Sequence, residues 1–390
     1  NSGYMFIGQI GFTYVYGLQS VWLMFGLIFG DFISSLFVHK NLRKKSEELK
    51  VVSFANLVSQ WHGKNYKYVQ LFGGLIILIF LSTYAAAQLN AGSKSMHVLF
   101  GLDYRLGAII GGVIVLLYCF SGGIRASIWT DAAQSFVMIV AMFLMVFFGI
   151  KEVGGVSIFI DELHKISPDY MKWFPSTNFS EFLLAPYMFI IGWFFSGVGV
   201  IGQPHVMVRF MTIDSTKNIP KTRIYYYTWY TLFYLFSILA AFVARLLIPE
   251  TNNMDPELAL PTLAQNLLPE FFVGVILAGI FAATMSTADS QILACTASIT
   301  NDLSLNKNNN YLINKLATLI ITVFVVTIAI NDNKNVFNLV LMSWSTLACC
   351  FSPLLIVNSL KQKVSEFSSL MMMIIPLITL IVWRHYELNT

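Results

Sequence analysis

The stretch Gly197-Val198-Gly199-Val200-Ile201-Gly202-Gln203-Pro204 lies in the middle of an apolar run over 183–210. Glycine and proline weaken or break a helix, and a helix interrupted at membrane depth exposes backbone carbonyls and helix ends. The first apolar run of the chain carries Gly3, Gly8 and Gly11. Interrupted segments at corresponding positions of two halves indicate the midplane binding site of a transporter. The alternative is that these glycines serve only close helix packing.

The composition indicates a protein of the lipid bilayer. Of 390 residues, 56% are hydrophobic and 11% charged, and the mean hydropathy is +0.68. A soluble chain carries about 25% charged residues, so a secreted disulfide scaffold, a nucleic-acid-binding protein and a cytosolic enzyme are excluded. We expect no nucleic-acid partner and no obligate protein partner. The four cysteines lie in apolar runs, which predicts buried thiols. With no initiator Met or signal peptide before the first apolar run, we expect a fragment whose first helix is cut.

Apolar runs of about 20 residues predict membrane-spanning helices. Eleven such runs are present, over 1–16, 17–39, 68–100, 105–123, 124–150, 183–210, 224–248, 271–300, 312–331, 336–360 and 366–386. Of the 24 Lys and Arg residues, sixteen fall on one side of these spans, seven fall on the other, and Lys94 lies within a span. Because positive charge accumulates on the cytoplasmic side, the loops holding Lys40 to Lys50, Lys217 to Arg223 and Lys361 to Lys363 are predicted to be cytoplasmic. The expected location is the plasma (inner) membrane, crossed many times.

The first ten spans divide into two groups of five, and these groups must cross in opposite directions because five is odd. The spans 68–100 and 271–300 are both unusually long, and each is followed by two more. We therefore expect an all-α polytopic membrane protein with a five-plus-five inverted-repeat transporter core. Its predicted parts are a first repeat over 1–150 with an incomplete first helix, an external loop with a short surface helix over 151–182, a second repeat over 183–360 and a trailing transmembrane helix over 361–390.

Polar residues gather inside the eighth span, in Met285-Ser286-Thr287-Ala288-Asp289-Ser290-Gln291. Ser286, Asp289 and Ser290 share one helical face by their spacing. Hydroxyl and carboxylate oxygens are hard donors, which suit Na⁺ rather than a soft metal. The alternative is an interhelical hydrogen-bond cluster. That alternative is the weaker one, because a carboxylate inside the membrane needs a cation or a proton.

Other polar residues in spans leave more alternatives open. Asp131 is either a ligand or an interfacial charge. Snorkelling or helix capping is the predicted role of residues nearer the span ends, namely Asp31, Lys94, His97, His205 and Arg209. Tyr84 and Gln88 lie one turn apart and could line a cavity. The same role is open to Gln9, Trp193, Trp344 and Ser345.

Two glycine motifs have structural explanations. Gly197-x-Gly199-x-x-Gly202 matches a dinucleotide fingerprint, but it lies in an apolar span with no preceding strand, so the match is rejected. Gly26-x-x-x-Gly30 predicts helix-on-helix packing. No nucleophile–base set, zinc spacing or phosphate loop is present in the sequence, and we do not expect an enzyme.

Three motifs in order resemble one known family. The stretch 121–134, SGGIRASIWTDAAQ, resembles the signature of the sodium/solute symporter family. The segment from Gly202-Gln203-Pro204-His205 to Met211 is similar to the sixth-core-helix motif of its sodium/proline symporter branch, and 282–302 resembles its eighth core helix. Ser2-Gly3-Tyr4 fits its first core helix.

The resemblance implies the five-plus-five fold and sodium-coupled import of a small organic solute, with an amino acid such as proline first in line. The alternatives are a symporter for a sugar, sialic acid or carboxylate, a uniporter or channel of the same fold, and a transporter-like sensory module.

The resemblance also implies site residues. The principal sodium site would use carbonyls at Asn1 and Ala283 and the hydroxyls of Ser286 and Thr287. In family members with a second sodium ion, the ligands match Asp131, Ser286, Asp289 and Ser290, so one or two ions are expected. Where Asp289 stands the family usually has a small residue, and an acid there would strengthen a cation site or hold a proton. The positions matching the solute cavity are Ser2, Gly3, Tyr84, Gln88, Trp344 and Ser345. In the proline branch, aromatic residues stand where this chain has Ser196 and Val200. This difference argues against proline as the solute.

Overall fold

The computed structural model describes residues 2–174, 185–248, 254–303, 310–331 and 335–386, and within it the side chains of 121–126 and 185 are left undescribed. The described part is helical and holds no strand. Its α-helices are α1 (Gln9–Tyr16), α2 (Val21–Leu49), α3 (Phe54–Gln60), α4 (Lys67–Phe100), α5 (Tyr104–Val153), α6 (Val156–Ile166), α7 (Ala185–Val198), α8 (Pro204–Met211), α9 (Ile219–Leu247), α10 (Ala259–Leu267), α11 (Glu270–Ala297), α12 (Tyr311–Asn331), α13 (Val336–Ser359) and α14 (Glu366–His385). A π-helical segment, Tyr4–Gly8, precedes α1, and a second one, Ser298–Asp302, follows α11.

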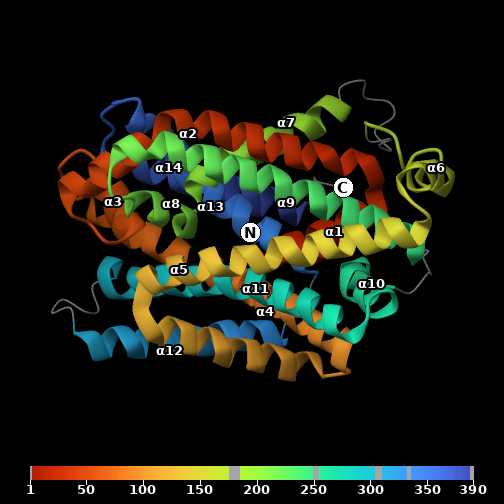
Figure 1. Ribbon diagram of the computed structural model, residues 1–390. Coiled ribbons are helices and arrows are strands. Elements are labelled where there is room, and N and C mark those ends of the chain that lie inside the picture. The colour runs from red at the N-terminus through yellow and green to blue at the C-terminus, as the bar shows by residue number, and fades with distance from the viewer. Residues whose placement is uncertain (1, 175–184, 249–253, 304–309, 332–334, 387–390) are drawn as a thin grey trace.

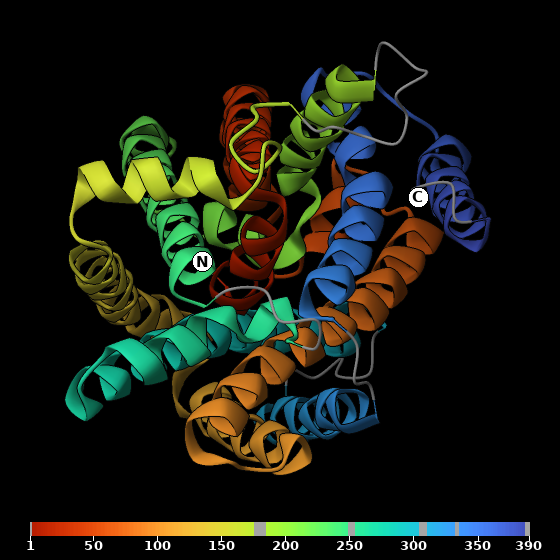
Figure 2. The ribbon, with the colours of Figure 1, turned by 90° about the vertical axis from the view of Figure 1, so that its right-hand side faces the viewer.

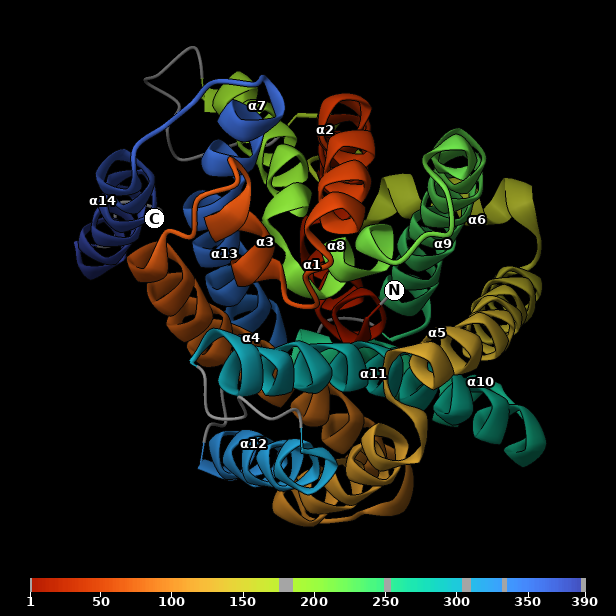
Figure 3. The ribbon, with the colours of Figure 1, turned by 90° about the vertical axis from the view of Figure 1, so that its left-hand side faces the viewer.

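The long helices run side by side across Figure 1, and short helices cover the two ends. Helix α3 lies at the left end, whereas α6 and α10 lie at the right end. Figures 2 and 3 view the bundle from these two ends, with α12 and α14 at its periphery. The Lys/Arg distribution assigns the α3 end to the cytoplasm and the α6 end to the outside. Phe29, Phe136 and Phe147 are exposed on outer helix faces, where lipid is the solvent.

Two helical stretches are too long for a single crossing. The first, Tyr4–Leu49, has 46 residues and the second, α5, has 50. At 1.5 Å per residue these would extend roughly 70 Å, twice the hydrocarbon thickness of about 30 Å. Gly17, with φ +69°, divides the first stretch between α1 and α2. Figure 1 shows α5 folded into two arms, which correspond to Tyr104–Phe120 and Ser127–Val153.

The segment after the second predicted span is not a loop. Helix α2 continues to Leu49, so the basic segment from Lys40 is helical rather than a loop. Its exposed turns carry the i,i+4 ion pairs Arg43–Glu47 (3.4 Å) and Lys44–Glu48 (3.8 Å). Such pairs stabilise a surface helix by roughly 0.2–0.5 kcal/mol each. The charged turns therefore prolong the helix beyond its apolar part.

The interrupted sixth span is confirmed. Helices α7 and α8 form one apolar pair that bends by 54°, with a 3₁₀ turn at Gly199–Gly202 and an extended Gln203 between them. A β-carbon on Gly197 would lie 2.5 Å from the carbonyl oxygens of Gly26 and Leu27 on α2. The close approach of α2 and α7 thus requires glycine, and the predicted helix-on-helix packing at Gly26 is confirmed.

Candidate functional site

The polar segment of α11 faces the interior of the bundle. Ala283 is fully buried, and Ser286 and Thr287 are each 8% exposed. The Ser286 hydroxyl donates to the Ala283 carbonyl at 3.3 Å, one turn earlier. Because that hydroxyl uses its hydrogen inside the helix, its oxygen lone pairs remain available to a cation.

The start of the chain lies directly beside this segment. The Gly3 backbone N–H donates to Oε1 of Gln88 on α4 at 2.8 Å. A β-carbon on Gly3 would lie 2.6 Å from Cγ2 of Thr284 and 2.9 Å from Cβ of Ala91. Ser2 and Gly3 are therefore held between α4 and α11. Asn1, the remaining predicted sodium ligand of this segment, lies outside the described residues.

A cavity of about 390 Å³ connects the two sets of predicted residues. Three predicted sodium ligands line it: Asp131, Ser286 and Thr287. Four predicted solute residues also line it: Ser2, Tyr84, Ser196 and Trp344. Its volume lies within the range of about 300–1,000 Å³ typical of small-molecule sites. An ion and a solute bound here would share one enclosure.

Aromatic side chains form much of the cavity wall. The Tyr84 ring packs edge-on against the His205 ring at 5.5 Å and against the Trp344 ring at 6.4 Å. On α9, cavity-lining tyrosines contact one another one turn apart: Tyr226 and Tyr230 stack at a centroid distance of 5.6 Å, and Tyr230 meets Tyr234 edge-on at 5.1 Å. A wall of rings with hydroxyl groups offers apolar contact and hydrogen bonding to one solute.

Trp344 also holds the broken helix in place. Its Nε1 donates to the Ser196 carbonyl at 3.3 Å, and its own carbonyl accepts from Nε2 of Gln203 at 3.0 Å. Because Gln203 is the extended residue between α7 and α8, Trp344 of α13 ties the end of α7 to the break itself.

Several predicted solute residues do not line this cavity. Ser345 donates its hydroxyl to the Leu341 carbonyl at 2.6 Å and accepts from Arg384 of α14 at 3.2 Å. Gln9 is fully buried, where it accepts from the Tyr4 hydroxyl and donates to Thr13, both at 3.2 Å. Val200 is 1% exposed and packed in the core. Gly3 and Gln88 bond to each other beside the cavity rather than line it.

The remaining predicted ligands form a charged cluster with Arg209 of α8. Its Nη2 pairs with the Asp131 carboxylate on α5 and donates to the Ser290 hydroxyl on α11 at 2.6 Å. Asp289 accepts from the Cys119 thiol at 3.0 Å. The predicted snorkelling role of Arg209 is therefore wrong. The side chain turns inward because the Asp131 carboxylate compensates its charge and the Ser290 hydroxyl accepts a further hydrogen bond.

A second cavity of about 710 Å³ lies at the cytoplasmic end of the bundle. Its lining includes Arg43, Asp302 and Lys315, and His205 and Arg209 line both cavities. The first cavity also reaches Ile213 and Thr222, near the loop assigned to the cytoplasm. Both cavities thus extend toward the cytoplasmic end, with His205 and Arg209 between them.

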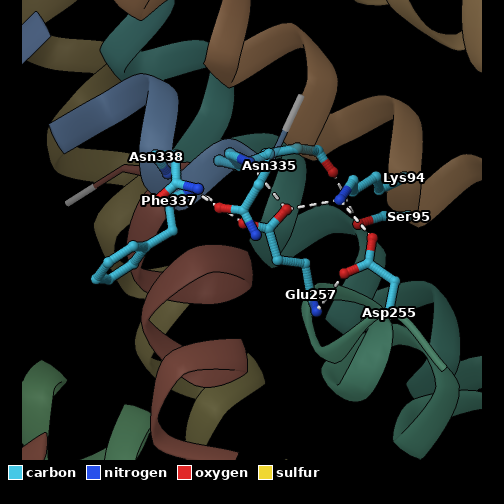
Figure 4. A network of polar contacts seen from close by, with 9 residues as sticks. Lys94, Ser95, Asp255, Glu257, Asn335, Phe337 and Asn338 are labelled. Carbon is cyan, nitrogen blue, oxygen red and sulfur yellow. Dashed lines mark hydrogen bonds and ion pairs between the residues drawn. The ribbon is translucent and has the colours of Figure 1, made fainter. Parts of the chain in front are cut away.

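At the opposite end an ion network joins α4, the turn over Asp255–Leu258 and the N-terminus of α13 (Figure 4). Lys94 of α4 pairs with Asp255 and Glu257, each at 2.6 Å. The Glu257 carboxylate, 2% exposed, also accepts from the backbone N–H groups of Val336 (2.9 Å) and Phe337 (2.8 Å). Its negative charge therefore lies at the positive N-terminus of α13. The predicted snorkelling role of Lys94 is wrong as well.

An aromatic layer lies beneath this network. The Phe337 ring stacks on Tyr4 at 5.4 Å and on Phe12 at 4.9 Å. A β-carbon on Gly11 of α1 would lie 3.0 Å from the Glu257 backbone nitrogen. Helices α1, α4 and α13 are thus drawn together at the external end.

Sequence reasoning gave Arg209 and His205 a role outside the site, and it missed the tyrosines of α9. His205 is 6% exposed, and its Nδ1 has no hydrogen-bond partner among the described residues. The tyrosine row had a signal in the sequence, because Tyr226, Tyr230 and Tyr234 recur every four residues on one helical face. The pairing of Arg209 with Asp131 had no signal in the sequence, because the two residues lie 78 positions apart.

Known proteins similar to this chain are membrane transporters. The chain is 29% identical over 395 residues to sodium/proline symporter 2 of Staphylococcus saprophyticus, covering 98% of this chain and 76% of that protein. It is 27% identical to the high-affinity proline transporter PutP of Bacillus subtilis, covering 100% of this chain and 82% of that protein.

Solved structures share the fold at low sequence identity. A Na⁺-coupled sialic acid symporter in a substrate-bound outward-open state has a TM-score of 0.72 at 16% identity, covering 98% of this chain and 87% of that one. A nucleobase-cation-symport-1 family transporter in a closed conformation has a TM-score of 0.59 at 14% identity, covering 91% and 74%. The predicted fold class, an all-α inverted-repeat transporter core, is confirmed. The sequence model of one family, described as the sodium:solute symporter family, matches residues 1–376. The chain belongs to the sodium:solute symporter family.

Proposed function

We propose that this chain is a sodium-coupled symporter of the plasma membrane that imports a small amino acid, with proline the first solute to test. Two relatives are named for proline. Membership of the family supports coupling to sodium.

The shared cavity carries the proposal. The predicted sodium ligands Ser286 and Thr287 and the predicted solute residues Ser2, Tyr84 and Trp344 line this one cavity. A sodium ion held by the Ala283 carbonyl and the two hydroxyls would fix α11 against the start of the chain. The solute would then meet a wall that is already ordered, so its binding would cost less free energy.

Coupling follows from this linkage. An ion that raises solute affinity must itself be bound more tightly when the solute is present. An inside-negative membrane potential adds about 2.3 kcal/mol per charge per 100 mV. When sodium leaves toward the cytoplasmic cavity, the affinity for the solute falls, and the solute is released on the same side.

Uptake into proteoliposomes tests this function. The purified protein is given labelled proline and a panel of other amino acids, a sugar, sialic acid and a carboxylate, with an inward Na⁺ gradient. An equal K⁺ gradient is the control. We expect accumulation of an amino acid with sodium only. Accumulation of one of the other solutes would overturn the solute class, and equal uptake with both cations would overturn the coupling.

A further inference from the structure

Asp31 is a buried acid of α2 that the proposed transport cycle does not use. Its side chain is fully buried, and neither carboxyl oxygen has a hydrogen-bond partner among the described residues. It lies ten residues after Val21, the first residue of α2. At 1.5 Å per residue this is about 15 Å along the helix, near the middle of a hydrocarbon layer of about 30 Å. The predicted snorkelling or capping role of Asp31 is therefore wrong.

Three side chains of α9 face this carboxyl group. They are the phenols of Tyr226 and Tyr227 and the guanidinium of Arg223. Nη2 of Arg223 donates instead to the Ser35 carbonyl of α2 at 2.9 Å, and no ion pair joins Arg223 to Asp31 within the described part of the chain. The negative charge of an ionised Asp31 would thus have no paired cation here.

The other elements packed against α2 add no cation that pairs with Asp31. Their titratable or charged side chains are Tyr187 of α7, His205 and Arg209 of α8, Lys217 of the turn before α9, and Cys349 and Cys350 of α13. Of these, His205 and Arg209 line the solute cavity. Tyr187 is exposed on the outer surface.

A second unpartnered group lies on the same face of α2. Ser35 and His39 follow Asp31 by four and eight residues, so the three side chains form a polar stripe toward the cytoplasmic end. His39 is 1% exposed, and neither ring nitrogen has a hydrogen-bond partner among the described residues. Its ring stacks on Phe210 of α8 at 3.7 Å. Because Phe210 and Tyr226 line the solute cavity, the stripe lies directly behind the cavity wall.

A proton fits the position of Asp31 better than a metal ion. A hard cation requires several oxygen ligands, whereas α9 supplies two phenols together with the fixed positive charge of Arg223. A proton requires one carboxyl oxygen and one acceptor, and a tyrosine hydroxyl accepts as well as donates. An acid inside the membrane that lacks a paired cation is stable in its neutral form.

We propose that Asp31 is a proton-binding site, separate from the sodium site, and that its proton regulates uptake through the contact of α2 with α9. In this structure the acid holds its proton. One proton passes from the carboxyl group to water and leaves a carboxylate, which attracts the Arg223 guanidinium. Because Arg223 is the neighbour of Thr222, which lines the solute cavity, this attraction changes the cavity wall. The effect on uptake rests on the proposed symport, whereas the proton site does not.

Infrared difference spectroscopy tests the site without transport. A protonated carboxyl group has a C=O stretching band distinct from that of a carboxylate. Wild type minus Asp31→Asn should show the acid band at neutral pH, and the band should fade as the pH is raised. The amide has the shape of the neutral acid, so we expect this variant to elute as folded.

Glu257→Gln is the matched control for the spectrum. Glu257 is 2% exposed, nearly as buried as Asp31, but its carboxylate pairs with Lys94 at 2.6 Å. Wild type minus Glu257→Gln should therefore show a carboxylate band and no acid band.

The pH dependence of uptake tests the regulation. With equal pH on both sides of the vesicle membrane, sodium-driven uptake by wild type should change several-fold between mildly acidic and mildly alkaline pH. Uptake by Asp31→Asn should vary much less. Arg223→Gln removes the positive charge that favours the carboxylate, so its pH profile should move toward alkaline pH. His39→Gln should keep the wild-type profile, because the proton is assigned to Asp31.

The two measurements separate the possible failures. An acid band of equal size in wild type and Asp31→Asn would overturn the proton site. A wild-type spectrum with no acid band at neutral pH would do the same, even if the variant does not fold. A pH profile shared by wild type and Asp31→Asn, or lost in His39→Gln, would overturn the assigned regulation. An absence of sodium-driven uptake at every pH would instead overturn the proposed function and leave the infrared result unaffected.

Discussion

Ser286 and Thr287 provide two side-chain oxygens at the proposed sodium site, and each can be removed singly. Ser286→Ala or Thr287→Ala should raise the sodium concentration for half-maximal uptake roughly tenfold, because each loses a contact of about 1.5 kcal/mol to a charged partner. Solute uptake at varied Na⁺ concentrations measures this half-maximal concentration.

Thr296→Ala is the control for both substitutions. Thr296 lies on the same helix, and its hydroxyl donates to the Ile292 carbonyl at 2.9 Å. The sodium requirement of this variant should match that of wild type. If Ser286→Ala and Thr287→Ala also match wild type, the sodium site lies elsewhere.

Trp344 and Ser345 are neighbours in sequence that face different surroundings. Trp344 lines the cavity, whereas Ser345 contacts Arg384 of the trailing helix. Trp344→Ala should raise the KM for the solute about tenfold or more, as expected for a buried aromatic anchor. Ser345→Ala should leave the KM unchanged. A similar KM for both variants in the uptake assay would mean that this cavity does not bind the solute.

The sequence identified single polar residues better than their partners. Asp289 and Ser286 stand out because carboxylates and hydroxyl clusters are rare inside a span. The partner of Asp131 could not be predicted, because Arg209 lies 78 positions later and meets it only in the folded bundle. Ser345 was misplaced for a similar reason, since its direction depends on where α14 packs.

At the scale of elements, the approach of α2 to α7 gives a prediction about stability. Gly197→Leu would force a side chain into the α2 backbone at Gly26 and Leu27, whose atoms cannot move aside. Overpacking of this kind costs about 1–3 kcal/mol, so the thermal midpoint of the detergent-purified protein should fall.

The control lies on the same helix. Gly192 has no atom within 4 Å of where its β-carbon would be, so Gly192→Leu should leave the thermal midpoint near that of wild type. Equal midpoints for the two variants would contradict the packing described for α2 and α7.

Most elements could be predicted from apolar length and interruption. The break at Gln203 was predicted because glycine and proline interrupt an apolar run there. The continuation of α2 to Leu49 was not predicted, because helix-forming charged residues continue the helix after the apolar residues stop. Apolar length reports where lipid ends, whereas helix ends depend on local pairing and caps.

At the scale of the whole molecule, the two ends differ. Lys94, Asp255 and Glu257 close the external end over the Tyr4–Phe337 stack, whereas both cavities extend toward the cytoplasmic end. This arrangement is that of a transporter facing inward. Opening outward would require α13 to part from Glu257, whose carboxylate accepts from two backbone N–H groups of that helix.

Weakening the network should therefore shift the population outward. Glu257→Gln keeps the shape but removes the charge that pairs with Lys94 and the N-terminus of α13. A cysteine introduced at the cavity-lining Leu341, with the native cysteines replaced, should react several-fold faster with an impermeant maleimide added outside.

Lys165→Met serves as the control. Lys165 pairs with Glu162 at 2.6 Å on the exposed helix α6, and a surface ion pair contributes little. Labelling at Leu341→Cys should not change in this background. If Glu257→Gln also leaves the rate unchanged, the network does not hold the external end closed.

The central claim is that one cavity couples ion and solute, and reciprocal binding tests it most directly. Solute affinity is measured at saturating Na⁺ and in K⁺, and sodium affinity with and without the transported solute. We predict that sodium raises solute affinity and that the solute raises sodium affinity by the same factor. Ser286→Ala should weaken both effects together. Solute binding of equal strength in Na⁺ and K⁺ would contradict the account.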